Sequence, residues 1–147
     1  MKALLLVGFI TFGLTAFSQT SPVGRWKTID DKTHEVKSII DIFEKDGLLY
    51  GKVEKIFRKA SEDQNPKCDK CSGTQKDQPI IGMQILNSLK KASEIKWSGG
   101  EILDPVNGKT YSCKVTLTED GKKLEVRGFI GFSLLGRTQV WEREPAN

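Results

Sequence analysis

Two segments near opposite ends of the chain constrain its fold most, because both combine glycine, arginine and tryptophan in sequences typical of β-strands. The first is Gly24-Arg25-Trp26, and the second runs from Gly128 to Arg143. Edge strands carry unpaired backbone groups, and pairing the first strand of a sheet with the last removes both edges at once. We therefore expect the two segments to meet and to close a small barrel whose interior could serve a function.

The residues between these segments alternate strand and turn signals at a spacing typical of an all-β sandwich or barrel. Residues 36–44 and 48–57 are rich in apolar and β-branched side chains, and Lys45-Asp46-Gly47 lies between them. Asp-Gly between two apolar runs predicts a hairpin, because glycine accepts the positive φ of a tight turn. A second hairpin is predicted from the period-two alternation of residues 111–117, with a turn before the return strand at 124–130.

One segment fits two kinds of element. Within residues 80–89, Ile81, Ile85 and Leu89 have the spacing of a helix face. Ile81, Met83 and Ile85 alternate as in a strand. A short helix and a strand both remain open for this segment.

The first residues have the layout of a secretory signal peptide. Met1-Lys2 gives a positive start, residues 3–14 are apolar and uncharged, and Ala16-Phe17-Ser18 offers small residues for a signal peptidase. The apolar run is shorter than the roughly 20 residues that a membrane span needs. We expect cleavage near Ser18, export to the periplasm or beyond, and one mature domain at residues 19–147 without a transmembrane span.

Charge gives little reason to expect a highly charged partner. The formal net charge is +4, and basic and acidic residues are interspersed, as in Lys122-Lys123 beside Glu119-Asp120. A nucleic-acid-binding domain more often gathers lysine and arginine on one face. We expect no nucleic-acid partner, and we expect a monomer.

The sharpest local motif is Cys68-Asp69-Lys70-Cys71, within a polar loop at residues 58–79. Loops of this length are usually functional or mobile. In an exported protein the pair favours a disulfide, which would stabilise the fold by about 2 kcal/mol on the chain-entropy model. A thioredoxin-like redox pair is the second interpretation, although the preceding Asn65-Pro66-Lys67 differs from the strand-to-helix junction that such chemistry needs.

Metal binding is a third interpretation of the motif, because zinc takes four ligands from cysteine, histidine and carboxylate. Cys113 and the only histidine, His34, would have to complete such a set. Cys113 alternates with Tyr111 and Val115, which predicts a buried thiol in a strand, and His34 lies in a polar turn that we expect to be exposed. We expect no metal and no cofactor.

Residues for other catalysis are scarce. A Ser-His-Asp arrangement would have to use His34, and no serine lies in a strained nucleophile turn. Asp104, in a turn between predicted strands, is expected to hydrogen-bond to its own turn. No glycine-rich phosphate loop is followed by a helix. The sequence therefore favours a non-enzymatic protein.

Aromatic and arginine side chains gather in or beside the predicted strands. They are Trp26, Trp97, Tyr111, Phe129, Phe132 and Trp141, with Arg25, Arg127, Arg137 and Arg143. One interpretation is a filled core with arginines stacked on indole rings, each contact contributing about 0.5–2 kcal/mol. The other is an aromatic-lined interior in which an arginine pairs with a ligand carboxylate or phosphate.

A family resemblance follows from motifs spread over residues 24–143. They are Gly24-Arg25-Trp26, Leu49-Tyr50-Gly51-Lys52, Asn65-Pro66, Ile81-Gly82-Met83, Trp97-Ser98-Gly99-Gly100, Asp104-Pro105-x-Asn107-Gly108-Lys109-x-Tyr111, Leu124-x-Val126-Arg127-Gly128 and Leu135-Gly136-Arg137-Thr138-Gln139-x-Trp141. Together they resemble the bacterial exported family called domain of unknown function 2147. The first motif, facing an arginine of the last strand, also resembles the lipocalin and calycin pattern. The resemblance implies a lipocalin-like barrel and an extracytoplasmic location, and it implies no catalytic residue.

These observations predict one antiparallel β-barrel of about eight strands, whose interior is either packed or able to hold one small ligand. We expect a small apolar or amphipathic ligand, lined or oriented by Trp26, Tyr111, Arg127, Arg137 and Trp141. Arg137 and Trp141 are also expected to join the closing seam beside Trp26. The alternatives are an envelope interaction module that uses the loop 58–79 and, less favoured, a thiol-redox or metal-dependent enzyme.

Overall fold

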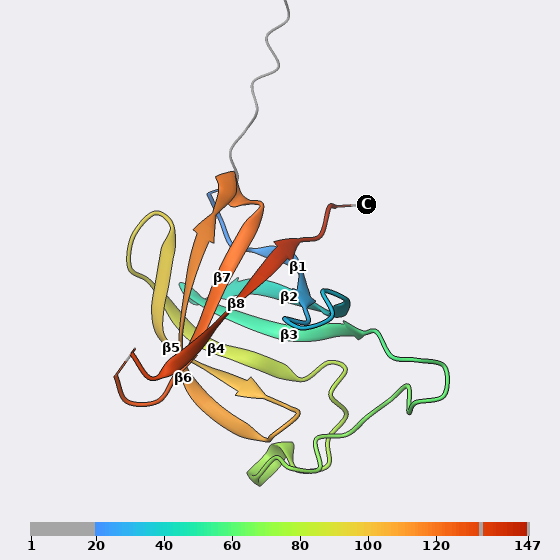
Figure 1. The fold of residues 1–147 in the computed structure, drawn as a ribbon. Coiled ribbons are helices and arrows are strands. Elements are labelled where there is room, and N and C mark those ends of the chain that lie inside the picture. The colour runs from blue at the N-terminus through green and yellow to red at the C-terminus, as the bar shows by residue number, and fades with distance from the viewer. Residues whose placement is uncertain (1–19, 133, 147) are drawn as a thin grey trace, which may run out of the picture.

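The computed structural model describes residues 20–132 and 134–146 (Figure 1). The predicted signal peptide at residues 1–18 lies outside these residues. Within the described part of the chain, no helix has both the length and the apolar character needed to cross a membrane.

Eight antiparallel strands form a single closed barrel in which each strand pairs with its neighbours in sequence, and the last pairs with the first. The strands are β1 (Gly24–Ile29), β2 (Val36–Lys45), β3 (Leu48–Ile56), β4 (Gln84–Lys91), β5 (Lys96–Asp104), β6 (Lys109–Thr118), β7 (Lys123–Phe129) and β8 (Gly136–Arg143). The only helical elements of the described residues are two 3-10 turns, η1 (Gly73–Gln75) and η2 (Glu119–Gly121). The predicted all-β barrel is confirmed.

The turns follow the predicted chemistry. Between β2 and β3, Asp46 and Gly47 have φ values of 53° and 76°, the left-handed conformation that Asp-Gly supplies in a two-residue hairpin. Between β5 and β6, the Asp104 carboxylate accepts a hydrogen bond from the Val106 backbone N–H at 2.9 Å. Asn107 accepts one from the Lys109 N–H at 2.8 Å. Asp104 is therefore a turn-forming residue, as expected.

Of the undecided segment, residues 84–89 belong to strand β4, whereas residues 80–83 form the turn before it. A bulge in β4 interrupts its alternation. On β3 one residue lies between Leu49 and Gly51, whereas two residues lie between their partners Leu89 and Leu86 on β4. Ser88, inside this stretch, has a φ of 56°. An extra residue in one strand shifts the alternation of its side chains. Leu86 and Leu89 are therefore both buried at a spacing that also suits a helix.

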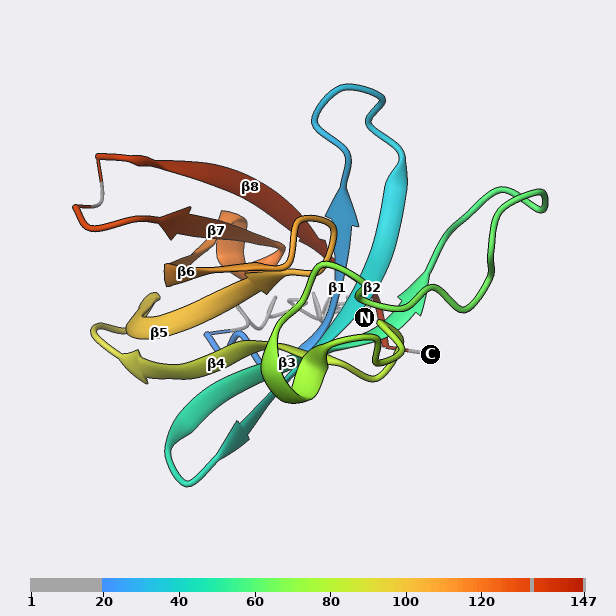
Figure 2. The same cartoon turned by 90° about the horizontal axis from the view of Figure 1, so that it is seen from below.

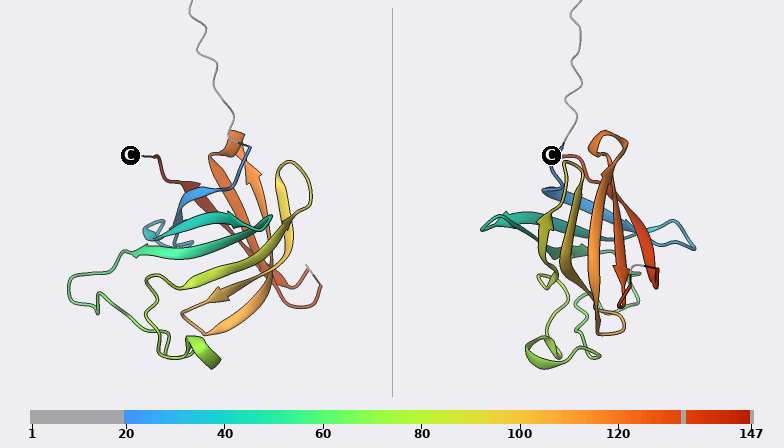
Figure 3. Two further views of the ribbon diagram at one scale, coloured as in Figure 1. Left: turned by 180° about the vertical axis from the view of Figure 1, so that it is seen from behind. Right: turned by 90° about the vertical axis from the view of Figure 1, so that its left-hand side faces the viewer.

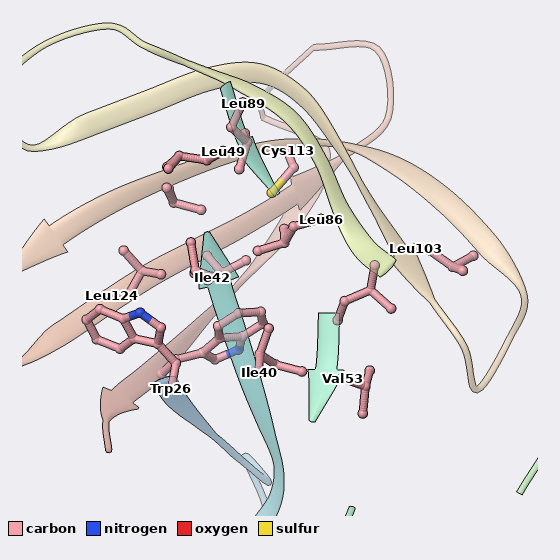
Figure 4. Packing of buried hydrophobic residues seen from close by; sticks show 14 of the residues in the cluster. Trp26, Ile40, Ile42, Leu49, Val53, Leu86, Leu89, Leu103, Cys113 and Leu124 are labelled. Atoms are coloured by element: carbon pink, nitrogen blue, oxygen red, sulfur yellow. The ribbon is translucent and has the colours of Figure 1, made fainter. Parts of the chain in front are cut away.

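Buried apolar side chains form one cluster, which includes the end of the barrel that holds Trp26 and Leu124 (Figure 4). In β6 the alternation predicted from sequence holds, with Cys113, Val115 and Leu117 buried. Trp26 of β1 and Leu124 of β7 are fully buried in the same cluster. No polar or charged side chain of the described residues is buried. This end of the barrel is therefore a packed apolar plug.

Pairing between β1 and β8 closes the barrel, but the ladder is short. Only Trp26 with Arg143 and Lys27 with Glu142 are in register. The two strands meet near the C-terminal end of β8 and separate toward the β1–β2 and β7–β8 connections (Figure 2). The predicted meeting of the end segments is confirmed, and the seam is tight only at the packed end.

Candidate ligand-binding site

A cavity of about 960 Å³ occupies the other half of the barrel. Its walls come from the end where β1, β3, β5 and β7 finish and β2, β4, β6 and β8 begin. The apolar residues that line it, through side chain or backbone, include Ile29, Ile40, Val53, Ile56, Phe57, Ile80, Ile85, Ile102, Leu103, Val106, Val126, Phe129, Ile130, Leu135 and Trp141. The barrel is therefore packed at one end and hollow at the other.

Three of the predicted site residues, Tyr111, Trp141 and Arg137, lie in this lining. Tyr111 of β6 is half-buried, and its hydroxyl accepts a hydrogen bond from the Asn107 side-chain amide at 3.0 Å. Trp141 of β8 is buried, with 2% of its surface exposed, and it forms part of the cavity wall next to the core. These two side chains give the cavity one polar handle and one large apolar surface.

Arg137 also lines the cavity, at its mouth. Its guanidinium forms an ion pair with the carboxylate of Asp31 in the β1–β2 connection. Both side chains are largely exposed. The pair spans the region where β1 and β8 separate, so a ligand carboxylate or phosphate at the mouth would compete with Asp31 for Arg137.

The other two predicted site residues lie outside the lining. Arg127 of β7 donates a hydrogen bond to the Thr138 hydroxyl at 3.1 Å. It lies on the outer face of the barrel, because the neighbouring Val126 and Gly128 face the cavity. Trp26 belongs to the packed end. The structure thus brings together three of the five predicted residues, and the binding role of all five stays a prediction.

The arginine beside Trp26 is Arg143, where the sequence had led us to expect Arg137. The Arg143 guanidinium carbon lies 4.2 Å from the centroid of the Trp26 ring. Its nitrogens donate hydrogen bonds to the carbonyl oxygens of Gly121 at 2.6 Å, Val23 at 3.1 Å and Ser21 at 2.7 Å. Partial burial lowers the pKa of Arg143 from its ordinary value. Arg143 therefore joins three segments at the packed end.

The loop at residues 58–79 carries a disulfide between Cys68 and Cys71, as predicted. Both cysteines are buried, and Cys68 has no exposed surface. The disulfide segment packs against the β5–β6 turn so closely that a Cβ at Gly108 would lie 1.9 Å from the Lys70 carbonyl oxygen. Residues of the loop, including Pro66 and Lys67, line the cavity. The disulfide therefore holds part of the mouth in place.

The remaining titratable candidates are apart from one another. Cys113 is a buried free thiol, and burial raises its pKa to about 12. His34 is exposed in the β1–β2 connection. Over residues 20–132 and 134–146, no three histidine, cysteine, aspartate or glutamate side chains are grouped so that they could hold a metal ion. The site therefore combines an apolar cavity with charged side chains at its mouth.

Comparison with known proteins agrees with this architecture. Residues 24–143 match the family described as an uncharacterized protein conserved in bacteria, DUF2147. The chain belongs to this family. The solved structure of protein HP1028 from Helicobacter pylori, described as belonging to the lipocalin family, is similar to this DUF2147 chain. The two have a TM-score of 0.74 and 21% sequence identity, with 86% of this chain and 85% of that chain covered. No match was found among curated proteins.

The likeness to HP1028 shows that the DUF2147 chain has a lipocalin-like fold. At 21% sequence identity, the likeness concerns the fold and not the ligand.

Proposed function

We propose that this protein is a non-catalytic extracytoplasmic binding protein that holds a small apolar or amphipathic molecule inside its barrel. The observation that carries the proposal is the cavity of about 960 Å³ in the hollow half. This volume is close to the upper end of the range of small-molecule sites, about 300–1,000 Å³. A cavity of this size also argues against the alternative of an interaction module with a filled interior.

The lining indicates the chemistry of the ligand. Aliphatic side chains such as Ile40, Val53 and Ile85 form the inner wall. Charged side chains of both signs lie at the mouth: the basic ones are Lys37, Arg58, Lys67 and Arg137, and the acidic ones are Asp30, Asp31, Glu62, Asp69 and Asp104. Burying a charge without a partner costs several kcal/mol or more, so a charged group would stay at the mouth while an apolar part enters. An amphipathic ligand with a polar or charged head satisfies both regions.

The proposed location rests on two features. Residues 1–18 have the pattern of a signal peptide, and disulfides such as Cys68–Cys71 persist mainly in oxidising compartments. An N-terminal sequence of the protein recovered from its host tests this location. A mature chain that begins at Gln19 is expected, and an intact Met1 would contradict export with cleavage.

Native mass spectrometry of protein purified without detergent tests the binding proposal first. A reproducible extra mass is expected, and the released molecule identifies the ligand. A fluorescent fatty-acid probe then tests the site, using Gly128→Leu, which projects a side chain into the cavity between Ile102 and Tyr111. Ser112→Leu is the matched control, because Ser112 is exposed.

We expect Gly128→Leu to weaken binding of the probe at least tenfold and Ser112→Leu to leave it unchanged. Equal binding by wild type and Gly128→Leu, with both folded, would place the ligand elsewhere. Arg137→Ala is expected to weaken an acidic probe and to spare its neutral alcohol analogue. If both probes bind Arg137→Ala as they bind the wild type, Arg137 does not orient the head group.

A further inference from the structure

The connection between β7 and β8 exposes a concentration of large apolar side chains. Ile130, Phe132, Leu134 and Leu135 have 64%, 82%, 90% and 70% of their surface exposed. Backbone hydrogen bonds from Ile130 N–H to Leu135 carbonyl and from Leu135 N–H to Phe132 carbonyl, each 3.0 Å, fold this connection into a compact tip. Both views in Figure 3 place the tip beyond the end of the β7–β8 hairpin. We call these four residues the apolar tip.

Isolated exposed apolar residues are common, but a cluster such as this marks an interaction site. The four side chains form a patch of a few hundred Å², which is less than the ~800 Å² per partner of a standard protein interface. A small convex apolar knob is therefore poorly matched to a stable second copy of the chain. It is well matched to a bilayer, which accepts apolar side chains from any direction.

Basic residues stand directly behind the apolar tip. On the outer face, Lys114 and Arg127 are in register with each other, next to the pair Ser112 and Phe129 at the base of the tip. The Lys114 ammonium lies 5.8 Å from the centroid of the Phe129 ring. Cations behind an inserted apolar segment attract the anionic headgroups of a membrane surface.

Acidic residues lie close to these cations on β5 and β7. Glu101 pairs with Ser112, and Glu125 follows one row farther from the tip, opposite Thr116. The charge behind the tip is thus mixed, with the cations Lys114 and Arg127 between these acids. We therefore expect apolar insertion to dominate, with a smaller contribution from anionic lipid.

The tip adjoins the cavity. Ile130 and Leu135 belong both to the tip and to the cavity lining, and Arg137 follows at the mouth. We propose that the apolar tip inserts into the surface of a lipid bilayer and holds the mouth of the barrel against it. The docking does not require that the cavity be occupied, so it can be tested separately from ligand binding.

Flotation with unilamellar vesicles tests the docking, using phosphatidylcholine alone and phosphatidylcholine with phosphatidylglycerol in equal parts. The test variant is Phe132→Ser with Leu134→Ser, and the control is Ile95→Ser, a half-exposed apolar residue (45%) in the β4–β5 turn at the packed end. We expect the wild type and the control to float with vesicles. The double variant is expected to bind the vesicles at least about tenfold more weakly than the wild type.

A fluorescent reporter locates the contact. The three native tryptophans are all buried, with at most 6% of their surface exposed, so Phe132→Trp adds one exposed indole. Its emission is expected to shift to the blue with vesicles and to be quenched by brominated lipid. Unfolding curves of every variant serve as the folding check, because the substituted side chains make little contact with the core.

Three results would overturn the docking proposal. The first is a wild type that fails to float with either vesicle, and the second is a double variant that floats as well as the wild type. The third is concentration-dependent dimerisation that the double variant abolishes in the absence of vesicle binding, since this would assign the tip to a second copy. Binding of the fatty-acid probe, measured in parallel without vesicles, reports separately on the cavity.

Discussion

Arg143 supports the closing seam of the barrel, and its replacement should lower stability strongly. The guanidinium stacks on Trp26 at 4.2 Å and donates hydrogen bonds to the carbonyls of Ser21, Val23 and Gly121. It thus ties the segment before β1 and the β6–β7 turn to the last strand. Arg143→Ala removes all of these contacts and leaves the backbone of the strands intact.

The expected cost follows from these contacts. Hydrogen bonds to a charged group contribute about 1.5–3 kcal/mol each, and the stacked indole about 0.5–2 kcal/mol. Ser21 and Val23 are exposed, so water replaces much of what their carbonyls lose, whereas Gly121 is buried. We expect Arg143→Ala to lower the free energy of unfolding by about 3–5 kcal/mol. Arg143→Lys, which keeps the charge but loses the planar fork, should cost about 2 kcal/mol.

Urea unfolding followed by circular dichroism and tryptophan emission measures these costs. Arg137→Ala is the matched control, because Arg137 lies on the same strand in an exposed ion pair whose loss costs less than about 1 kcal/mol. If Arg143→Ala is no more destabilising than Arg137→Ala, Arg143 does not support the seam. A double-mutant cycle with Trp26→Leu, which has no aromatic face, then separates the stacking contribution from the hydrogen bonds.

Three further predictions concern the loop and the core. Gly108→Ala should lower the free energy of unfolding by about 2–4 kcal/mol, because the positive φ of 72° and the clash with the disulfide loop both oppose a Cβ. Gly73→Ala, at a φ of 61° with open space around it, should cost only about 1 kcal/mol. Equal thermal shifts in the two variants would refute the clash. Serine at both Cys68 and Cys71 should lower stability by about 2 kcal/mol and speed cleavage of the loop by trypsin; unchanged cleavage would show that the disulfide does not order the loop. Because burial raises the pKa of Cys113 to about 12, its thiolate fraction at pH 8 should be roughly a thousandfold smaller in the folded than in the unfolded protein. Similar rates of reaction with Ellman's reagent in the two states would contradict its burial.

The strands and turns could be predicted because their signals are local. Alternation in residues 111–117 and the Asp46-Gly47 turn each need only a few neighbouring residues, and both are confirmed. The β4 bulge could not be predicted, because the extra residue at Ser88 is defined by pairing with β3, which lies far away in the sequence. Without that register, a bulged strand and a helix face show the same apolar spacing.

Register also explains the error about the seam. Arg137 and Arg143 lie on one strand and on the same side of it, so alternation alone cannot tell which one reaches Trp26. They are six residues apart, about 20 Å along a strand, which places one at the mouth and the other at the packed end. Arg127 is a different case, because the alternation of the buried Leu124 and Val126 places it on the outer face without any knowledge of register.

The short ladder between β1 and β8 has a consequence for how the protein is made. Its two residue pairs join strands separated by almost the whole chain, so they form only after the final strand has left the ribosome. Until then β1 and β7 both present unpaired edges, the kind of surface that pairs with other chains. Closure over so long a separation is also slow. A chain that lacks its last strand would therefore persist as an open sheet that is prone to aggregate. Pairing of β8 with β1 and β7 removes both exposed edges and ends the stage at which the chain can aggregate.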